Sequence, residues 1–291
     1  MKIGLIGLGY WGKIILKNLE GLGHKDIVVC ENDDHRRGQV VSPYQKVKHY
    51  KELQKHDVEC VFVITPAAQH YDICKYFLED GVHVFCEKPL SLSVKECQEL
   101  YSLAYQNECN LFVDWIFTFN AELKTIKKYL DSAQLGKLYS VFFNRLNFGP
   151  VRHDVSARID LASHDLSIIF WLFENNKLVS SQWLDYQNNH KTLMKDSAIG
   201  VLKFEEFVAV INASWHYPIK NRECIFAFEK GILKWDDITQ QVWFNNKLVE
   251  TPKELSPLEK SINEFFSFSA EKMKKQQILT QQVTALLEEG V

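Results

Sequence analysis

The chain has 291 residues, of which 46% are hydrophobic and 24% charged, and its formal net charge is -3. These values are typical of a soluble protein with room for two domains, and they give no sign of a nucleic-acid-binding or anionic-membrane surface. We expect no membrane span, because no stretch approaches the roughly eighteen apolar residues that one needs, and no secretory signal, because MKIGLIGLGYWG is followed by no cleavage site.

The first 118 residues alternate short apolar runs with amphipathic ones. The predicted strands cover residues 3–6, 27–30, 60–64, 83–86 and 111–113. The predicted helices cover residues 11–19, 69–79 and 94–106. Strands without polar alternation, each followed by a helix, are typical of a parallel sheet covered on both faces. The sequence therefore predicts an α/β fold whose N-terminal domain, residues 1–118, is a doubly wound Rossmann domain.

Residues 119–291 have a different rhythm and are predicted to form an α+β domain with a large, mainly antiparallel sheet. The predicted strands cover residues 139–146, 178–184, 198–204, 207–214, 224–228 and 241–244. The predicted helices cover residues 121–132, 162–174, 257–270 and 277–288. We expect the helices at 162–174 and 257–270 to cover one face of this sheet and to leave the other face open.

A glycine-rich turn follows the first strand directly. In GLGYWG, Gly7 permits a tight turn, Gly9 lets the backbone approach a pyrophosphate, and Gly12 lets helix and strand pack closely. The N-terminus of the next helix then offers unpaired amides to the phosphates. Such turns are common, but this one lies within a βαβ unit, and we expect it to bind a dinucleotide.

An acidic residue ends the second strand. Glu31 lies about 20 residues after the glycines, where a carboxylate accepts hydrogen bonds from the adenosine ribose. Because that carboxylate repels a 2′-phosphate, NAD is favoured over NADP as the cofactor. Arg36 and Arg37 follow closely; they can reverse this preference or simply begin a solvated helix.

A lysine follows the strand at 83–86, in the segment HVFCEKPLSLS. Ligands of doubly wound sheets bind beyond the carboxyl ends of the strands, and Pro89 excludes the helical conformation for Lys88. Lys88 is therefore expected to be extended or in a turn and to point toward the ligand crevice. Taken alone, a loop lysine paired with Glu87 is an equally good reading.

Several motifs together resemble the glucose-fructose oxidoreductase, inositol dehydrogenase and MocA (Gfo/Idh/MocA) family. The matching segments, in order, are GLGYWG, ITPAAQH at 64–70, CEKPLS at 86–91, DLASHDLSIIFWL at 160–172 and, more loosely, ASWHYPIKNR at 213–222. The resemblance covers nearly the whole chain, and the combination of EKP with DxxxH makes it specific.

The resemblance implies a catalytic group formed by Lys88, Asp160 and His164. Residues four apart on a helix share a face, so Asp160 and His164 can project into one cleft. We expect His164 to take the hydroxyl proton as a hydride leaves for NAD, Lys88 to bind the hydroxyl oxygen, and Asp160 to orient His164 or to bind a neighbouring hydroxyl. The roles of Lys88 and His164 can also be exchanged, because a desolvated lysine can act as the base.

Other site residues are implied by the same resemblance. The cofactor contacts are expected from the glycines, Glu31 and Lys88 together with Tyr10, Trp11, Thr65, Pro66, His70 and Glu87. For the substrate, we expect contacts from Asn120, Arg152, Lys88, Asp160 and His164, with Arg158 and Arg222 as further anion contacts; surface arginines are the simpler reading. The glycine pair that often precedes DxxxH in the family is replaced by Val155 and Ser156, and Thr118 replaces an arginine, so we expect the substrate pocket to differ even where the chemistry is retained.

The expected reaction is oxidation of a hydroxyl of a sugar or nucleotide sugar, because GYWG, FVDWIF and IDLASHDLS resemble members of bacterial nucleotide-sugar pathways. The alternatives are a reductase of the biliverdin or dihydrodiol type and a non-catalytic dinucleotide-binding regulator. An apolar cleft wall favours the non-sugar reductase, whereas converging donors and acceptors favour the sugar enzyme.

The remaining expectations concern location and assembly. Seven cysteines without a CxxC pair predict buried, reduced thiols, a cytoplasmic protein and no zinc site. The resemblance implies a homodimer or homotetramer built through the open face of the C-terminal sheet. Trp183, Trp215 and Trp243 suit such an interface, or they fill the core of their own domain.

Overall fold

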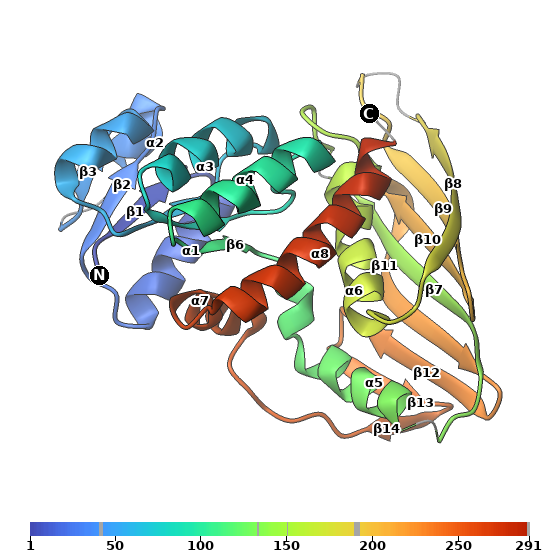
Figure 1. Ribbon diagram of the computed structural model, residues 1–291. Helices are drawn as coiled ribbons and strands as arrows, with labels where there is room; N and C mark the ends of the chain where they lie inside the picture. The colour runs from blue at the N-terminus through green and yellow to red at the C-terminus, as the bar shows by residue number, and fades with distance from the viewer. Residues whose placement is uncertain (41–42, 133, 150, 189–192, 290–291) are drawn as a thin grey trace. The chain divides into compact units, whose positions relative to one another are not determined.

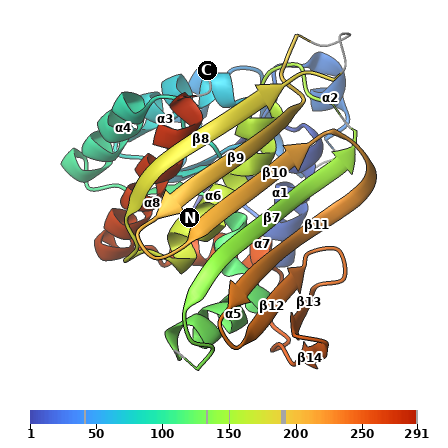
Figure 2. The same cartoon turned by 90° about the vertical axis from the view of Figure 1, so that its right-hand side faces the viewer.

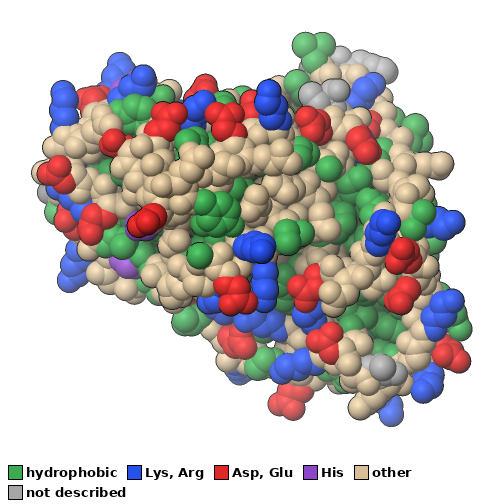
Figure 3. Space-filling model, viewed as in Figure 1, with side chains coloured by type: hydrophobic (Ala, Val, Ile, Leu, Met, Phe, Trp, Pro, Cys, Tyr) green, Lys and Arg blue, Asp and Glu red, His purple; other side chains and the backbone are tan. Residues whose placement is uncertain are grey.

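The computed structural model describes residues 1–40, 43–132, 134–149, 151–188 and 193–289. The chain divides into two compact units, one formed by Met1–Ile116 with Leu258–Glu288 and the other mainly by Phe117–Pro257. Among the described residues, no helix combines the length and hydropathy needed to cross a bilayer. Basic and acidic side chains are interspersed on the face shown in Figure 3, in keeping with the small net charge.

The first unit is built on a six-stranded parallel sheet with the order β3-β2-β1-β4-β5-β6 (Figure 1). Its strands are β1 (Ile3–Ile6), β2 (Ile27–Cys30), β3 (Gln45–Val47), β4 (Cys60–Val63), β5 (His83–Cys86) and β6 (Leu111–Val113). The helices between them are α1 (Tyr10–Gly21), α2 (Asp34–Gly38), η1 (Tyr50–His56), η2 (Ala67–Gln69), α3 (His70–Glu79) and α4 (Val94–Gln106). The predicted doubly wound sheet is confirmed. Strand β3 was not among the predicted strands, because its three residues, two of them exposed, form no apolar run.

Two C-terminal helices complete this unit, α7 (Pro257–Phe266) and α8 (Ala270–Glu288). The ring of Phe265 lies 5.4 Å from that of Phe62 and 5.7 Å from that of Phe85, both in the core of the parallel sheet. Gln276 bonds both the N–H and the C=O of Val113 and so occupies the edge of β6. We expected a helix at 257–270 to cover the antiparallel sheet, and this is wrong: α7 packs on the parallel sheet because Phe265 matches its aromatic core.

The second unit contains an eight-stranded sheet with the order β14-β13-β12-β11-β7-β10-β9-β8, which Figure 2 shows from its open side. Its strands are β7 (Leu138–Phe148), β8 (Leu178–Tyr186), β9 (Ser197–Phe204), β10 (Val208–Ser214), β11 (His216–Phe228), β12 (Gly231–Asp236), β13 (Gln241–Phe244) and β14 (Lys247–Val249). Its helices are α5 (Ala121–Asp131), the π-helical turn η4 (Arg158–Ala162) and α6 (Ser163–Leu172), and η3 (Ile116–Phe119) precedes them. All strand pairs are antiparallel except β7 with β10, so the predicted mainly antiparallel sheet is confirmed.

The two faces of this sheet differ in what covers them. On one face Phe170 of α6 packs against Phe204 of β9, with ring centroids 6.1 Å apart. On the other face Phe142 and Val201 are each 42% exposed, and both flank Val210 in the strand register. The sheet therefore has one core face and one open face with an apolar strip.

Candidate active site

Two glycines of the first turn are required by the fold itself. Gly7 has φ +95°, and a Cβ on it would lie 2.6 Å from the carbonyl oxygen of Ile64. A Cβ on Gly12 would lie only 2.1 Å from the carbonyl oxygen of Gly7. Larger residues at these positions would force β1, β4 and α1 apart.

The middle glycine faces open space. A Cβ on Gly9 would meet no protein atom within 4 Å, so the fold itself does not demand glycine there. Gly9 caps α1 without a side-chain hydrogen bond, and the first turn of α1 carries no acidic residue. The amides of this turn, next to the 84% exposed Tyr10, are of the kind that can bind an anion at a helix N-terminus. Gly9 thus leaves room for a group that approaches the backbone closely, as a pyrophosphate does.

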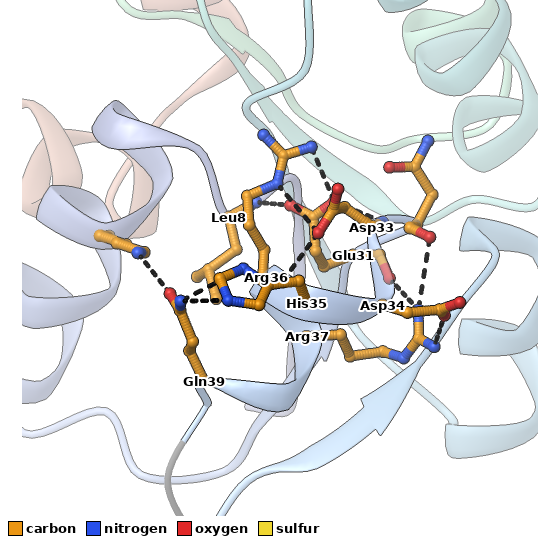
Figure 4. A network of polar contacts seen from close by, with 10 residues as sticks. Leu8, Glu31, Asp33, Asp34, His35, Arg36, Arg37 and Gln39 are labelled. Atoms are coloured by element: carbon orange, nitrogen blue, oxygen red, sulfur yellow. Dashed lines mark hydrogen bonds and ion pairs between the residues drawn. The ribbon is translucent and has the colours of Figure 1, made fainter.

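The carboxylate of Glu31 is buried in the loop network of Figure 4, with 4% of the residue exposed. Its oxygens accept the N–H groups of Leu8 at 2.8 Å and Asp33 at 2.9 Å. Arg36 Nη2 lies 3.4 Å from Glu31 Oε1, whereas Arg37 turns to Asp34 and to the Glu31 carbonyl. Of the two arginines, Arg36 is therefore the one beside the carboxylate.

The loop after β4 carries a buried hydroxyl. Thr65 Oγ1 is buried and has no hydrogen-bond partner among the described residues, so it is suited to a ligand. His70 is 1% exposed; its Nδ1 lies 2.7 Å from the Pro89 carbonyl and its Nε2 2.8 Å from the Thr65 carbonyl. His70 thus ties the Thr65 loop to the turn after β5, while Pro66 is exposed. Gly9 and Thr65 both fit a dinucleotide.

The turn after β5 carries Lys88 at the carboxyl end of the sheet, where it is partly exposed. The preceding Glu87 accepts the indole N–H of Trp11 through Oε1 and the backbone N–H of Lys88 through Oε2, the latter at 3.2 Å. Trp11 belongs to the first turn of α1. The glycine-rich turn and the Lys88 turn are therefore joined by one carboxyl group.

Asp160 and His164 are the only residues between Val155 and Phe170 that are not buried. Asp160 lies in the π-helical turn η4, and His164 lies in the first turn of α6. Such π-turns are frequent at functional sites. A stretch that buries every other side chain and exposes these two presents them to a ligand.

The carboxylate of Asp160 is anchored from two sides. Arg152 Nη1 lies 3.3 Å from Oδ1, and the indole Nε1 of the buried Trp215 lies 3.3 Å from Oδ2. Arg152 also binds Asp154 through Nε and Nη2, and its guanidinium lowers the pKa of Asp154. Asp160 therefore stands among polar groups that suit a hydroxylated ligand.

The ring of His164 packs edge-on against Phe117, with centroids 4.9 Å apart. Phe117 in turn stacks under the guanidinium of Arg145, 4.4 Å from its ring centroid. Arg145 binds Asp165 through Nε at 3.0 Å and Nη2 at 2.7 Å, and both side chains are buried. Burial raises the pKa of Asp165, and the charge of Arg145 opposes this shift. The ion pair between Arg145 of β7 and Asp165 of α6 holds the two elements together, so His164, the residue before Asp165, has a fixed position.

Two further predicted contacts lie in this unit. Asn120 is 3% exposed and forms the N-cap of α5. Arg158 is 2% exposed, its Nη1 lies 3.1 Å from Asp185 Oδ2, and its guanidinium stacks on Trp183 at 4.2 Å. The alternative reading of Arg158 as a surface arginine is wrong.

Lys88 belongs to the first compact unit, and Asp160 and His164 belong to the second. That these three groups act on one substrate stays a prediction. Trp215 and Phe117, which contact Asp160 and His164, are supporting residues that the sequence did not predict. A third is Asp114, whose N–H donates to the carbonyl of Cys86, the residue before Glu87. Its signal in the sequence is an acidic residue directly after an apolar strand, as at Glu87. In the described part of the chain, no cluster of His, Cys, Asp or Glu could hold a metal ion.

Two family models match the chain. Residues 1–115 match "Oxidoreductase family, NAD-binding Rossmann fold", and residues 123–234 match "GFO/IDH/MocA C-terminal domain". Inositol 2-dehydrogenase of Salmonella typhimurium is 22% identical over 247 residues, which cover 80% of this chain and 73% of that protein. The oxidoreductase YrbE of Bacillus subtilis is 26% identical over 180 residues, 57% of this chain and about half (51%) of that protein.

Solved structures share the fold at low sequence identity. UDP-N-acetylglucosamine 3-dehydrogenase GnnA from Acidithiobacillus ferrooxidans superposes with a TM-score of 0.84 at 19% identity, covering 99% of this chain and 96% of that one. WlbA dehydrogenase from Bordetella pertussis, in complex with NADH and UDP-GlcNAcA, gives 0.81 at 16%, covering 99% and 94%. An inositol dehydrogenase homolog from Azotobacter vinelandii, complexed with NAD+, gives 0.83 at 15%, covering 99% and 93%.

Proposed function

Because this chain belongs to the Gfo/Idh/MocA oxidoreductase family, we propose that it transfers a hydride between a nicotinamide cofactor and a hydroxyl or keto group of a sugar or nucleotide sugar. One observation carries the proposal. Asp160 and His164 are the two partly exposed side chains in a stretch that is otherwise buried, and they stand where the family's DxxxH motif stands.

The first unit supplies the cofactor site in this proposal. The pyrophosphate binds at Gly9 and the N-terminus of α1, Glu31 accepts the ribose hydroxyls, and Thr65 donates its unpaired hydroxyl. NAD is favoured over NADP because the Glu31 carboxylate disfavours a 2′-phosphate. When bound, the nicotinamide supplies the hydride chemistry.

The side chains of the site bind the substrate and move one proton. Lys88 donates a hydrogen bond to the reacting oxygen and stabilises its negative charge. His164 takes the hydroxyl proton on its imidazole, since imidazole titrates near neutrality. Asp160, held by Arg152 and Trp215, orients His164 or accepts a hydrogen bond from a neighbouring hydroxyl. The exchanged assignment, with Lys88 as the base, is an alternative outcome of the test below.

A nucleotide sugar is the substrate class that we favour. The polar surroundings of Asp160 suit a polyhydroxylated ligand better than an apolar one such as a bilin. GnnA is named as a dehydrogenase of a UDP-sugar, and WlbA is described in complex with one. Inositol 2-dehydrogenase is named for a cyclic polyol. These names support the class without identifying the sugar.

The test is a panel of UDP-sugars, free sugars and inositols, each mixed with NAD or NADP, with NADH or NADPH formation followed by absorbance. We expect turnover with at least one nucleotide sugar. Lys88→Met should lose nearly all turnover and retain NADH binding. A Lys88→Met protein with wild-type turnover refutes the site assignment. Bilins and dihydrodiols are assayed separately, and tight NADH binding without turnover on them or on any member of the panel supports a regulator instead.

The pH profile of kcat distinguishes the two candidates for the base. If His164 is the base, His164→Asn removes the acidic limb of the profile near neutrality. If Lys88 is the base, His164→Asn retains that limb.

A second copy of the chain is the partner that we propose for the open face of the antiparallel sheet. Its exposed apolar residues include Phe142, Val201, Val208 and Leu184. Trp215 is buried within its own unit and does not belong to this surface. All seven cysteines are free and buried, which supports a reducing location such as the cytoplasm.

A further inference from the structure

Glu87 and Asp114 lie side by side at the carboxyl end of the parallel sheet. Cys86 of β5 is in register with Val113 of β6, so the next residue of each strand occupies the neighbouring position. The N–H of Asp114 donates to the Cys86 carbonyl at 2.9 Å, which continues the strand pairing by one residue. Neighbouring strands are about 4.8 Å apart, and residues in register point to the same face. The two carboxyl groups are therefore neighbours, and Glu87 acts on the pKa of Asp114.

A hydrogen bond between two carboxyl groups needs a proton on one of them. Asp114 is 1% exposed, its Oδ1 accepts the Ser261 hydroxyl at 2.6 Å, and its buried Oδ2 has no hydrogen-bond partner among the described residues, so Oδ2 is available to a protonated Glu87. Glu87 already accepts the N–H groups of Trp11 and Lys88. Two ionised carboxylates here would repel each other with little water to screen them.

We propose that Glu87 and Asp114 share a single proton and that this carboxyl pair positions Trp11 and Lys88 for the reaction. The shared proton keeps Glu87 beside Asp114, and from there Glu87 binds the first turn of α1 and the backbone of the Lys88 turn. The pair itself lies wholly in the first unit. Only the importance of Lys88 for turnover rests on the proposed function.

The electrostatics of the pair agree with this geometry. Burial, and next the charge of Asp114, raise the pKa of Glu87 to about 8, while the charge of Lys88 and the Trp11 indole lower it in part. Burial raises the pKa of Asp114 to about 6, opposed by the Ser261 hydroxyl, by Glu87 and by Lys88. Lys88 is the cation that acts on both groups.

The neighbouring thiols do not compete for this proton. Burial raises the pKa of Cys86, which directly precedes Glu87, well above its ordinary value. Burial also raises the pKa of Cys97 on α4, to about 11. With a pKa of about 6 for Asp114 and about 8 for Glu87, we expect the pair to hold one proton near neutral pH and to lose it at higher pH.

The sign of the pH effect follows from the raised pKa of Glu87. The folded protein binds the Glu87 proton more tightly than the unfolded chain does. The contribution of this proton to the free energy of unfolding is therefore full below the unfolded pKa of 4.5. That contribution falls as the pH rises from 4.5 to the folded pKa of about 8. Above that pH, repulsion from Asp114 displaces Glu87 and loosens its hold on Trp11 and Lys88.

The direct test is carboxyl 13C NMR of the full-length protein carrying [δ-13C]glutamate, with Glu87→Gln used to identify the Glu87 signal. We expect Glu87 to show the chemical shift of a neutral acid at pH 7 and to titrate near pH 8. Asp114→Asn should lower the titration midpoint of Glu87, because a like charge is removed. Glu79→Gln, at an exposed glutamate of α3, should leave it unchanged. A Glu87 signal that titrates near its ordinary value overturns the proposal.

A second readout follows the positioned groups. The indole N–H resonance of Trp11, identified with Trp11→Phe, should shift together with the Glu87 titration, and the shift should move to lower pH in Asp114→Asn. An indole signal that is constant across this range refutes the positioning role.

The kinetic readout separates this proposal from the proposed function. Turnover should fall above about pH 8 in the wild type, with the same midpoint as the Glu87 NMR signal, and Asp114→Asn should lose this fall because the charge that repels Glu87 is gone. If Lys88→Met abolishes turnover while Glu87 titrates normally, the function stands and the carboxyl pair fails. If Glu87 titrates near pH 8 and no substrate of the panel turns over, the shared proton stands and the proposed function fails.

Discussion

The indole Nε1 of Trp215 lies 3.3 Å from Oδ2 of Asp160, so a tryptophan of the sheet layer supports the partly exposed carboxylate of the DxxxH segment. Trp215 is 1% exposed, between β10 and β11, whereas the Asp160 side chain is 18% exposed. A buried donor of this kind holds the carboxylate without screening from water. The position of Asp160 is therefore set partly by the sheet beneath it.

Trp215→Phe should lower kcat/KM by about ten- to a hundredfold while the protein stays folded, because one hydrogen bond to a charged group is worth about 1.5–3 kcal/mol. Steady-state kinetics on the best substrate of the panel measures this loss. Trp235→Phe is the matched control: Trp235 is also buried in this unit, but its Nε1 has no hydrogen-bond partner among the described residues. Equal kinetic losses in both variants would show that the Trp215 effect is loss of packing.

The sequence predicted those parts of the site that depend on local pattern. The sequence predicts these residues from their positions next to a strand, a turn or a proline. They are the glycines of the first turn, Glu31 at a strand end, and Lys88 before a proline. Asp160 and His164 were expected from the family resemblance and from their spacing of four residues, which puts two side chains on one helix face.

The sequence did not predict the parts that depend on contacts between distant segments. Nothing near residue 265 indicates that Phe265 joins Phe62 and Phe85, more than 170 residues earlier in the chain. Trp215 was considered only as an interface or core residue, since its hydrogen bond to Asp160 spans 55 positions. Such pairings arise from tertiary packing, which local periodicity does not encode.

Gly9→Ala should keep the melting temperature of the wild type and weaken NADH binding by about tenfold or more. A Cβ at Gly9 meets no protein atom within 4 Å, so it projects only into the space proposed for the pyrophosphate. Thermal unfolding and a fluorescence titration with NADH measure the two effects. Gly12→Ala is the contrasting variant, because its Cβ would lie 2.1 Å from the Gly7 carbonyl oxygen, and it should lose stability. Undiminished NADH binding by folded Gly9→Ala would place the cofactor elsewhere.

Arg36→Ala should reduce use of NADP about tenfold and leave use of NAD nearly unchanged. The Arg36 side chain is 46% exposed and lies beside the Glu31 carboxylate, so it is the cation available to a 2′-phosphate. The ratio of kcat/KM for the two cofactors is the measurement. Arg37→Ala is the control, since Arg37 binds Asp34 and a backbone carbonyl, and its ratio should stay at the wild-type value. If the ratio changes in Arg37→Ala and not in Arg36→Ala, then Arg37, and not Arg36, recognises the 2′-phosphate.

Phe142→Glu should convert the proposed homo-oligomer into monomers. Phe142 lies on β7 in the open face, flanked by Val210 on β10 and by Ile225 on β11, and an isologous interface would bury both copies of it. Two glutamates facing each other in a dry interface would cost far more than one exposed glutamate on a monomer. Sedimentation equilibrium measures the mass, and Ile278→Glu, at a 52% exposed position of α8, is the control that should keep the wild-type mass. A wild-type protein that is monomeric at high concentration would refute the interface. An oligomer that persists in Phe142→Glu would place the interface on another surface, because an apolar strip that stays hydrated contributes nothing to association.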